Sequence, residues 1–456
     1  MTPRYGYYMG EVVVWLGLAM AAAAAEGGSG NLFTVVDRQL DEFGKPQSFV
    51  DGHLTIKTGG EFRYRLELRD DFHFNNGAFE DDVVHLSRTR VHVDVSAQRY
   101  ARLFVQGQDA ESFAGSSLNR TNGFIDRLDL RQLFVELMSP WAGIPAKLKV
   151  GRQELSYGDQ RFVGAFDWSN VARVFDALKM SWTPTSRMQV DGWFSQVVLV
   201  DRVGPDSADH GENFYGLYSS FKPIRNHVLD AFFFLRHDRD NELRGEVISH
   251  RGQLKECTLG NRFKGNHNNI DYGIEWAWQF GSRAHEEIRA WAWHNELGYT
   301  FAAVPWSPRI GLEYNHGSGD NNSSDGRVGN FDNLFPTNHP YYGYMDFAGL
   351  RNLDHAELNL TVKPVKPLTL IAKHHWLFLD TNKSAWFNAG QGVIRAAGVS
   401  ASEILGQEVD LLVKWQISQH VDTLMGYSHF HAGAFVRDTG ASDDANFFYW
   451  QTTVKF

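Results

Sequence analysis

Charged and apolar side chains alternate in the segment 61–69, which reads Glu-Phe-Arg-Tyr-Arg-Leu-Glu-Leu-Arg. Guanidinium groups bind carboxylates in a bidentate manner and stay charged at any physiological pH. Because successive side chains of a β-strand point to opposite faces, this segment would carry one ionic face and one apolar face. A soluble sandwich would bury the apolar face, whereas a membrane barrel would turn it to lipid and turn the ionic face to a water-filled interior.

Other strand-like segments also carry charged residues on the face opposite their apolar side chains. A lipid-facing arginine costs roughly 2–4 kcal/mol at the bilayer midplane, which predicts that such side chains line the interior of a barrel. The candidate pore-lining residues are Glu61, Arg63, Arg65, Glu67, Arg88, Arg90, Asp94, Arg152, Glu154, Arg262, Arg309, Glu408, Asp410 and Lys414. The strand that holds Arg152 is ambiguous, because Leu148 and Val150 share its parity.

Arginines in the interior indicate an anion path, and interleaved acids would weaken each contact so that a polyanion can bind and leave. The alternative is that the interior charges pair with one another and merely solvate the wall. An enzyme would need a nucleophile, a base and an orienting group within hydrogen-bond reach. Ser428 and His429 are neighbours that point to opposite faces, so no catalytic residue is predicted. A small-anion porin and an adhesin or structural barrel remain as further alternatives.

The period-2 pattern predicts about 18 strands, and hence an all-β fold, a transmembrane antiparallel β-barrel. The predicted strands are 55–69, 84–96, 101–109, 127–138, 147–155, 174–183, 187–198, 213–222, 227–238, 253–264, 270–280, 287–297, 308–316, 352–363, 368–379, 406–417, 421–431 and 446–456. Short connections such as 183–187 alternate with long ones such as 317–351, which is typical of periplasmic turns and outer loops. A barrel of about this size encloses an aqueous channel.

The N-terminal residues resemble a secretory signal, with Arg4, an apolar core from Val12 to Met20 and an alanine run ending at Ala25. A membrane anchor helix is the alternative, although the apolar stretch is short for a full span. We therefore expect a signal peptide at 1–25, a periplasmic lead-in at 26–54 and the barrel at 55–456. The chain ends on a strand with a terminal aromatic, Phe456, which resembles the signal read by the outer-membrane barrel assembly machinery.

Composition narrows the class further. Aromatic residues make up 14% of the chain, and they can form the interfacial girdles of a membrane barrel. The formal net charge of −10 argues against nucleic acid as a partner. Cys257 is the single cysteine, so an internal disulfide is impossible. The expected partners are outer-membrane lipid and an anionic saccharide solute, and the chain is expected to be a monomer.

Metal and cofactor signals are weak. The segment Asp320–Gly326 resembles the opening of a calcium loop but lacks the glycine at the sixth position, so loop calcium at Asp320 competes with a plain polar loop. His374 and His375 point apart on a strand, and nothing completes a site around His429 and His431. No cofactor and no metal ligand are predicted.

Several motifs together resemble the bacterial alginate export family of outer-membrane proteins. They are Val150-Gly-Arg-Gln-Glu-Leu155, Ser318-Gly-Asp320, Phe331-Asp-Asn-Leu-Phe-Pro-Thr-Asn-His339, Tyr342-Gly-Tyr-Met-Asp346, Gly406-Gln-Glu-Val-Asp410 and Gly426-Tyr-Ser428. The resemblance implies an 18-stranded barrel with an arginine-rich, partly acidic constriction that passes a uronate polymer. It implies constriction roles first for Arg152 and Arg262. It does not fix the solute, because the family occurs in bacteria not known to make alginate.

Overall fold

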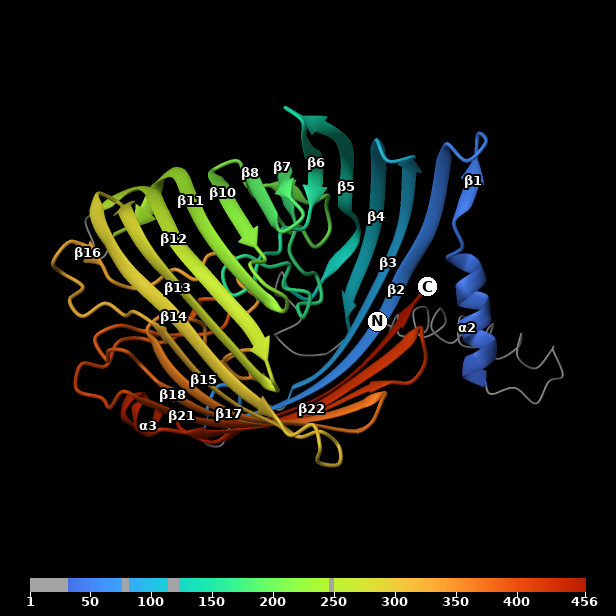
Figure 1. Ribbon diagram of the computed structural model, residues 1–456. Coiled ribbons are helices and arrows are strands. Elements are labelled where there is room, and N and C mark those ends of the chain that lie inside the picture. Colours follow the sequence, from blue (N-terminus) through green and yellow to red (C-terminus); the bar gives the residue numbers. More distant parts are fainter. Residues whose placement is uncertain (1–31, 76–81, 114–122, 246–249) are drawn as a thin grey trace, which may run out of the picture.

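A computed structural model describes residues 32–75, 82–113, 123–245 and 250–456. The predicted signal peptide at 1–25 and the first part of the lead-in lie outside these ranges. Within them, eighteen long antiparallel strands form one closed barrel, shown in Figure 1. They are β2 (Leu54–Asp70), β3 (Asp82–Ala97), β4 (Ala101–Ser112), β5 (Asp126–Trp141), β6 (Ile144–Gln153), β7 (Phe175–Thr185), β8 (Met188–Leu199), β10 (Glu212–Phe221), β11 (His227–Arg244), β12 (Arg251–His267), β13 (Ile270–Arg283), β14 (Glu286–Thr300), β15 (Arg309–Gly317), β17 (Leu353–Val365), β18 (Leu368–Phe378), β21 (Ile404–Gln416), β22 (Val421–Ala432) and β23 (Ala445–Lys455).

The first and last long strands close the barrel. β2 pairs with β23 in a register that runs from Glu61 opposite Lys455 to Asp70 opposite Asn446. Closure leaves no unpaired sheet edge, which is the condition for placing strands in a bilayer. All eighteen predicted strands are confirmed, and the largest shift of a boundary is the end of β11, which lies at 244 instead of 238.

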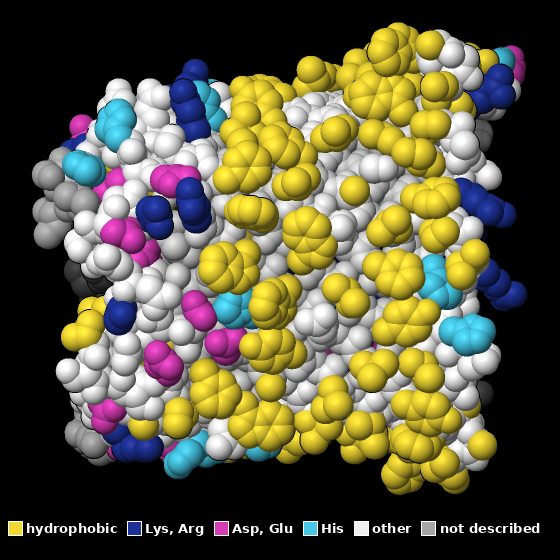
Figure 2. Space-filling model, turned by 60° about the vertical axis from the view of Figure 1, so that its left-hand side comes forward, with side chains coloured by type: hydrophobic (Ala, Val, Ile, Leu, Met, Phe, Trp, Pro, Cys, Tyr) yellow, Lys and Arg dark blue, Asp and Glu magenta, His cyan; other side chains and the backbone are white. Residues whose placement is uncertain are grey.

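The side chains of each strand alternate between an outer apolar face and an inner polar face of the barrel. On β13, Trp276 and Trp278 are exposed on the outside, whereas Glu275 and Gln279 are buried on the inside. On the face shown in Figure 2, hydrophobic side chains cover most of the strands, and charged side chains lie mainly on the left-hand side with a few along the right-hand edge. The period-2 pattern of the sequence therefore maps onto lipid and interior as a membrane barrel requires.

The connections alternate in length as expected. Two-residue turns such as 142–143 and 268–269 join strands at one end of the barrel, and long segments such as 154–174, 318–352 and 379–403 join them at the other. The connection between β13 and β14 is the exception, because it holds only Ala284 and His285.

The long connections fold back into the barrel and build a hydrophobic core there. Phe331, Phe335, Tyr342 and Trp386 from these connections are buried together with inward aromatic side chains such as Phe214. Short elements stabilise the connections: β9 (Ser207–Ala208), β16 (Arg327–Val328), β19 (Trp386–Phe387), β20 (Val393–Arg395) and helix α3 (Ala434–Thr439). Part of the interior is thus filled by protein, and the 154–174 connection, called the inserted loop below, reaches the barrel wall.

The lead-in packs against the end of the barrel that holds the short turns. It comprises helix α2 (Leu32–Phe43) and β1 (Gln47–Phe49), which pairs with the start of β2. The hydroxyl of Ser418 donates to Asp37 at 2.6 Å, and the Phe43 ring meets the Phe456 ring at 5.4 Å. Among the described residues, none of the helices is both long enough and apolar enough to cross a bilayer.

Candidate functional site: an arginine ladder covered by an inserted loop

Four arginines form a compact group on the inner face of two neighbouring strands. Arg63 and Arg65 come from β2, and Arg88 and Arg90 come from β3, with Arg63 directly opposite Arg88. We call this group the arginine ladder. All four residues are at most 5% exposed. Because buried guanidinium groups need acceptors, the ladder must find them either on its own wall or on something that lies across it.

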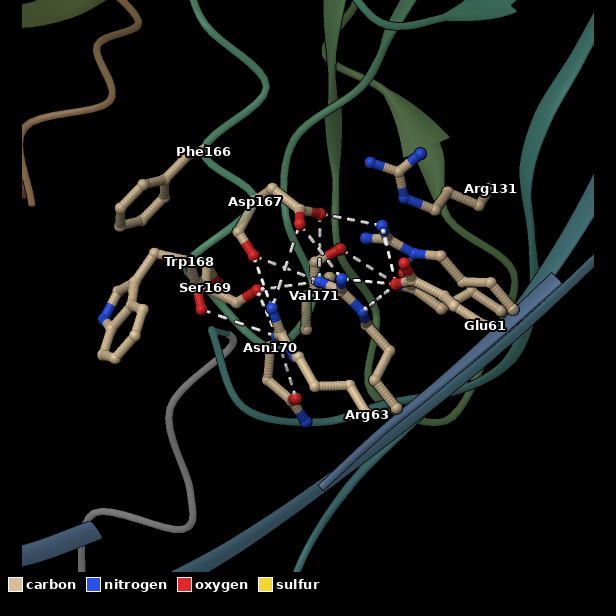
Figure 3. Close-up of polar contacts among 12 residues, drawn as sticks. Glu61, Arg63, Arg131, Phe166, Asp167, Trp168, Ser169, Asn170 and Val171 are labelled. Atoms are coloured by element: carbon tan, nitrogen blue, oxygen red, sulfur yellow. Dashed lines mark hydrogen bonds and ion pairs between the residues drawn. The ribbon is translucent and has the colours of Figure 1, made fainter. Parts of the chain in front are cut away.

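The inserted loop supplies most of these acceptors. Arg63 donates to the carbonyl oxygens of Asp167 at 2.7 Å and Ser169 at 3.0 Å, and Arg65 donates to that of Trp168 at 2.7 Å. Figure 3 shows these loop residues lying across the ladder, with Arg63 reaching up from β2. The ladder therefore holds the loop by its backbone, so this part of the contact does not depend on the loop's side-chain sequence.

Asp167 adds a carboxylate to this contact. Its side chain receives hydrogen bonds from Arg90 at 2.8 Å and Arg88 at 3.1 Å, and Arg63 lies 4.0 Å away. Burial alone would raise the pKa of Asp167, but the positive charges of Arg88, Arg90 and Arg63 outweigh it and hold the pKa well below its usual range. The side chain is nevertheless 57% exposed, so solvent reaches the carboxylate.

Stacking interactions fix the neighbouring Trp168. The Arg65 guanidinium lies 3.9 Å from the centre of the indole ring, and the His339 ring stacks on the indole at 3.7 Å. On the wall itself, Glu61 accepts from Arg88 at 3.0 Å, and Glu67 pairs with Arg65 at 2.7 Å. The ladder is thus a network of four arginines, two wall acids, the Gln108 amide oxygen that accepts from Arg90 at 2.7 Å, and one loop.

A second contact anchors the start of the inserted loop to a different part of the wall. Asp159 accepts from Arg262 at 2.9 Å and pairs with Lys264 at 3.1 Å, both on β12. Burial would raise the pKa of Asp159, but Arg262 and Lys264 lower it to about 2. Arg262 also bonds Asp230 on β11. The loop therefore spans the interior from β12 to β2 and β3.

Other basic side chains remain open to the interior. Lys147 and Lys264 have side chains about 40% and 39% exposed, and Arg102 and Arg309 are also partly exposed. Each has an acidic partner: Lys147 with Glu136, Lys264 with Glu296, Arg102 with Asp94, and Arg309 with Asp271. The interior is therefore basic in places, and these four cations are paired.

The structure places most of the candidate residues on the inner face. Inward-facing side chains are Glu61, Arg63, Arg65, Glu67, Arg88, Arg90, Asp94, Arg262, Arg309, Glu408, Asp410 and Lys414. They do not form one site: only the ladder and Glu61 meet at Asp167, whereas Glu408 and Asp410 are buried on β21, three strands away from β2 round the barrel. Glu154 lies just beyond β6 and accepts from Arg131 at 2.6 Å.

The inward direction predicted for Arg152 is wrong. On both flanks its cross-strand partners belong to the outer face, since Arg152 lies opposite Leu133 on β5 and Asp176 on β7. Its guanidinium pairs with Asp176 at 2.9 Å and donates to the Asp206 carbonyl at 3.1 Å. Arg152 faces the same side of the strand as Val150, which is the outer side. An ion pair near the strand end makes an outward-facing arginine tolerable.

Three groups of interior residues were not predicted from the sequence. Arg161 and Asp167 lie in a connection between strands, where side chains do not alternate between two faces. The sequence of this connection gave no sign that it turns into the barrel. Arg131 sits at a β-bulge, which breaks the alternation. Several histidines are also buried in the wall, and the period-2 pattern of their strands could have found them.

Clusters that could hold a metal ion occur at three places in the described chain. The ligand atoms of each lie within 4.8 Å of one another: His355, Glu357 and His375; His316, Asp354 and Asp380; Asp126, Asp129 and Asp206. In the first cluster His375 bonds both His355 and Asp410, and Lys373 pairs with Glu357 at 3.0 Å. The Asp320 carboxylate accepts from the backbone N–H groups of Asn322 and Gly329, and calcium there stays a prediction.

A closed 18-stranded barrel with an apolar outer face and a charged interior defines an outer-membrane channel of the porin class. The family model described as alginate export matches residues 55–449, so the chain belongs to the alginate export family, in the bacterial outer membrane. No curated protein matches the chain.

Solved structures with a similar fold are porins of Pseudomonas aeruginosa. OccK11 (OpdR) is 12% identical with a TM-score of 0.56, and the match covers 91% of this chain and 98% of that one. OccK2 (OpdF), solved in complex with glucuronate, is 8% identical with a TM-score of 0.59, and the match covers 90% and 99%. At these identities the likeness concerns the fold alone.

Proposed function

We propose that this protein is a passive outer-membrane channel for an anionic polysaccharide or its fragments, with uronate-like carboxylates as the recognised groups. The single observation on which the proposal depends is the environment of the Asp167 carboxylate, which accepts hydrogen bonds from Arg88 and Arg90 and lies beside Arg63. A uronate carboxylate offers the same oxygens to the same fork of donors. In this proposal Asp167 occupies the carboxylate site at rest, and the solute exchanges with it.

The paired charges elsewhere in the interior support movement instead of tight binding. Lys147, Lys264, Arg102 and Arg309 each already have an acid next to them. A passing polyanion would gain little at each step and could therefore leave again, as conduction requires. Glucuronate in a porin of the same fold makes uronates sensible probes, although the likeness to that porin does not extend to its residues.

A small-anion or general porin is the second candidate. The observation that favours it is that the ladder's arginines are almost fully covered by the inserted loop, which leaves few free guanidinium groups for a polymer. The two candidates differ in whether oligomers compete for the pore, and neither requires catalysis.

Planar-bilayer recording separates these candidates. The reversal potential in a KCl gradient reports whether the open channel prefers anions, and added mannuronate oligomers report recognition of uronates. Anion preference with block by uronates, and no block by neutral oligosaccharides of equal length, would support the proposal. Anion preference without block would favour the small-anion porin, and cation preference would reject both. For assembly we propose a lipid-embedded monomer inserted by the barrel assembly machinery.

A further inference from the structure

A chain of hydrogen-bonded, buried polar side chains begins on the inserted loop and crosses five neighbouring strands. It starts at Arg161 and continues through His294 on β14, Asn315 on β15, His355 on β17 and His375 on β18 to Asp410 on β21. Successive distances between the bonded atoms are 3.1, 2.6, 2.9, 2.8 and 2.9 Å. All six residues are buried, and His355, His375, Asn315 and Asp410 are completely so.

The direction of every hydrogen bond in this chain is fixed by its two ends. Arg161 can only donate, so the Nε2 atom of His294 accepts and its Nδ1–H donates to the Asn315 carbonyl oxygen. The Asn315 amide then donates to Nδ1 of His355, whose Nε2–H donates to Nδ1 of His375. The remaining Nε2–H of His375 donates to the Asp410 carboxylate. Each imidazole is neutral and uses one nitrogen as donor and the other as acceptor.

Arg161 belongs to the same loop that covers the arginine ladder. Its other contacts are Glu313 at 3.3 Å, the Tyr342 hydroxyl at 3.4 Å and the face of the Tyr341 ring at 3.8 Å. Arg161 therefore fastens the inserted loop to the wall formed by β14 and β15, while Asp167 fastens it to β2 and β3. Loss of either contact would free one side of the loop.

We propose that His294, Asn315, His355, His375 and Asp410 are positioning residues for Arg161, and that together they act as a latch that holds the inserted loop across the pore. Each imidazole must supply one donor and one acceptor, so replacing any of the three rings by an apolar side chain breaks the chain. The latch rests on the proposed function only in assuming that the barrel conducts.

Several other titratable groups face the chain from the elements packed around it. They are Glu275 from β13, Glu313 from β15, Tyr342 from the 318–352 connection, Glu357 from β17, Lys373 from β18 and Glu408 from β21. Lys373 and Arg161 oppose a further positive charge, whereas the carboxylates of Glu313 and Glu357 favour it. The chain thus lies among neighbouring charges of both signs, and its role is tested by removing its members one at a time.

The test compares two neighbouring histidines that point to opposite faces of β18. His375→Phe breaks the chain, and His374→Phe is the matched control, because His374 lies on the outer face and bonds Gln407. Single-channel KCl conductance is recorded at pH 7.5 without any sugar. We expect His375→Phe to open roughly tenfold more often than the wild type, as loss of a charge-assisted bond allows. His374→Phe should open as rarely as the wild type.

Two further comparisons keep the latch falsifiable if His375→Phe fails to give the heat-modifiable band of a folded barrel. Asp410→Asn retains an acceptor for His375 and should stay closed like the wild type, whereas Asp410→Leu should open more often. Arg161→Met should mimic a broken chain, and combining it with Asp410→Leu should add nothing, because both remove the same link. Equal opening frequencies of the wild type and Asp410→Leu, or additive effects of Arg161→Met and Asp410→Leu, overturn the latch. Failure of uronate block would instead refute the proposed solute and leave the latch standing.

Discussion

Asp167→Asn should strengthen uronate block, because it removes the internal carboxylate that occupies the ladder. The carboxamide keeps one oxygen, so of the charge-assisted bonds to Arg88 and Arg90 one is lost and the other becomes a neutral bond; a charge-assisted bond is worth about 1.5–3 kcal/mol when buried. Because the side chain is 57% exposed, solvent screening reduces the loss to about 1–2 kcal/mol. That free energy corresponds to a factor of about 5–30 in the population of the uncovered ladder. The apparent dissociation constant for the solute falls by the same factor.

The assay is the concentration of mannuronate oligomer that halves the single-channel current at pH 7. Asp159→Asn is the matched control, since it removes one negative charge from the same loop but from the contact with Arg262 and Lys264. A general change of interior charge would affect both variants alike. If Asp167→Asn and Asp159→Asn are blocked equally well, the exchange of Asp167 with the solute is refuted, even if both are blocked more strongly than the wild type.

Three further predictions concern individual side chains. Arg152→Ala should leave the reversal potential unchanged, because Arg152 lies on the outer face. Arg88→Ala should shift the reversal potential toward cation preference, because Arg88 lies on the inner face. Equal shifts for the two variants would contradict the assigned faces. Arg65→Ala should lower the unfolding free energy by roughly 3 kcal/mol, seen as a lower temperature of heat modification, because the buried Glu67 loses one of its arginine partners. The lowered pKa of Asp167 means that its contact is fully present above the ordinary carboxyl pKa of about 4 and is lost only as pH falls through the lower value. The wild type and Asp167→Asn should therefore show the same pH dependence of single-channel current between about pH 7.5 and pH 4.5.

The fold was predictable because a barrel wall has a strict local rule. Each strand must alternate lipid-facing and interior-facing side chains, and a segment such as 270–280 shows that alternation without reference to any partner. Strand ends were less certain: β11 continues beyond Asp238 to Arg244 across a register shift, where the pattern is polar on both faces. Arg152 shows the limit of the rule, because an ionic side chain near a strand end can face outward when it is paired.

The site was predictable only in part, because half of it comes from a loop. Parity located Arg63, Arg65, Arg88 and Arg90 on one wall, but it carried no information about what lies across them. Backbone carbonyls of 167–169 are their main partners, and a backbone carbonyl has no sequence signature. Such contacts depend on the path of the whole connection, which is set by long-range packing.

The covering of the ladder also bears on what the channel can select. Atoms of the inserted loop accept hydrogen bonds from Arg63, Arg88 and Arg90, and these donors need other acceptors when the loop leaves. A solute without carboxylates would leave buried donors unpaired, at a cost of about 1–3 kcal/mol for each. A uronate polymer can supply an acceptor as each loop contact breaks, so the exchange is close to balanced. In the proposed mechanism, attraction to free arginines therefore contributes little to selectivity. The main contribution is the free-energy cost of uncovering the arginines for a solute that cannot replace the loop's acceptors.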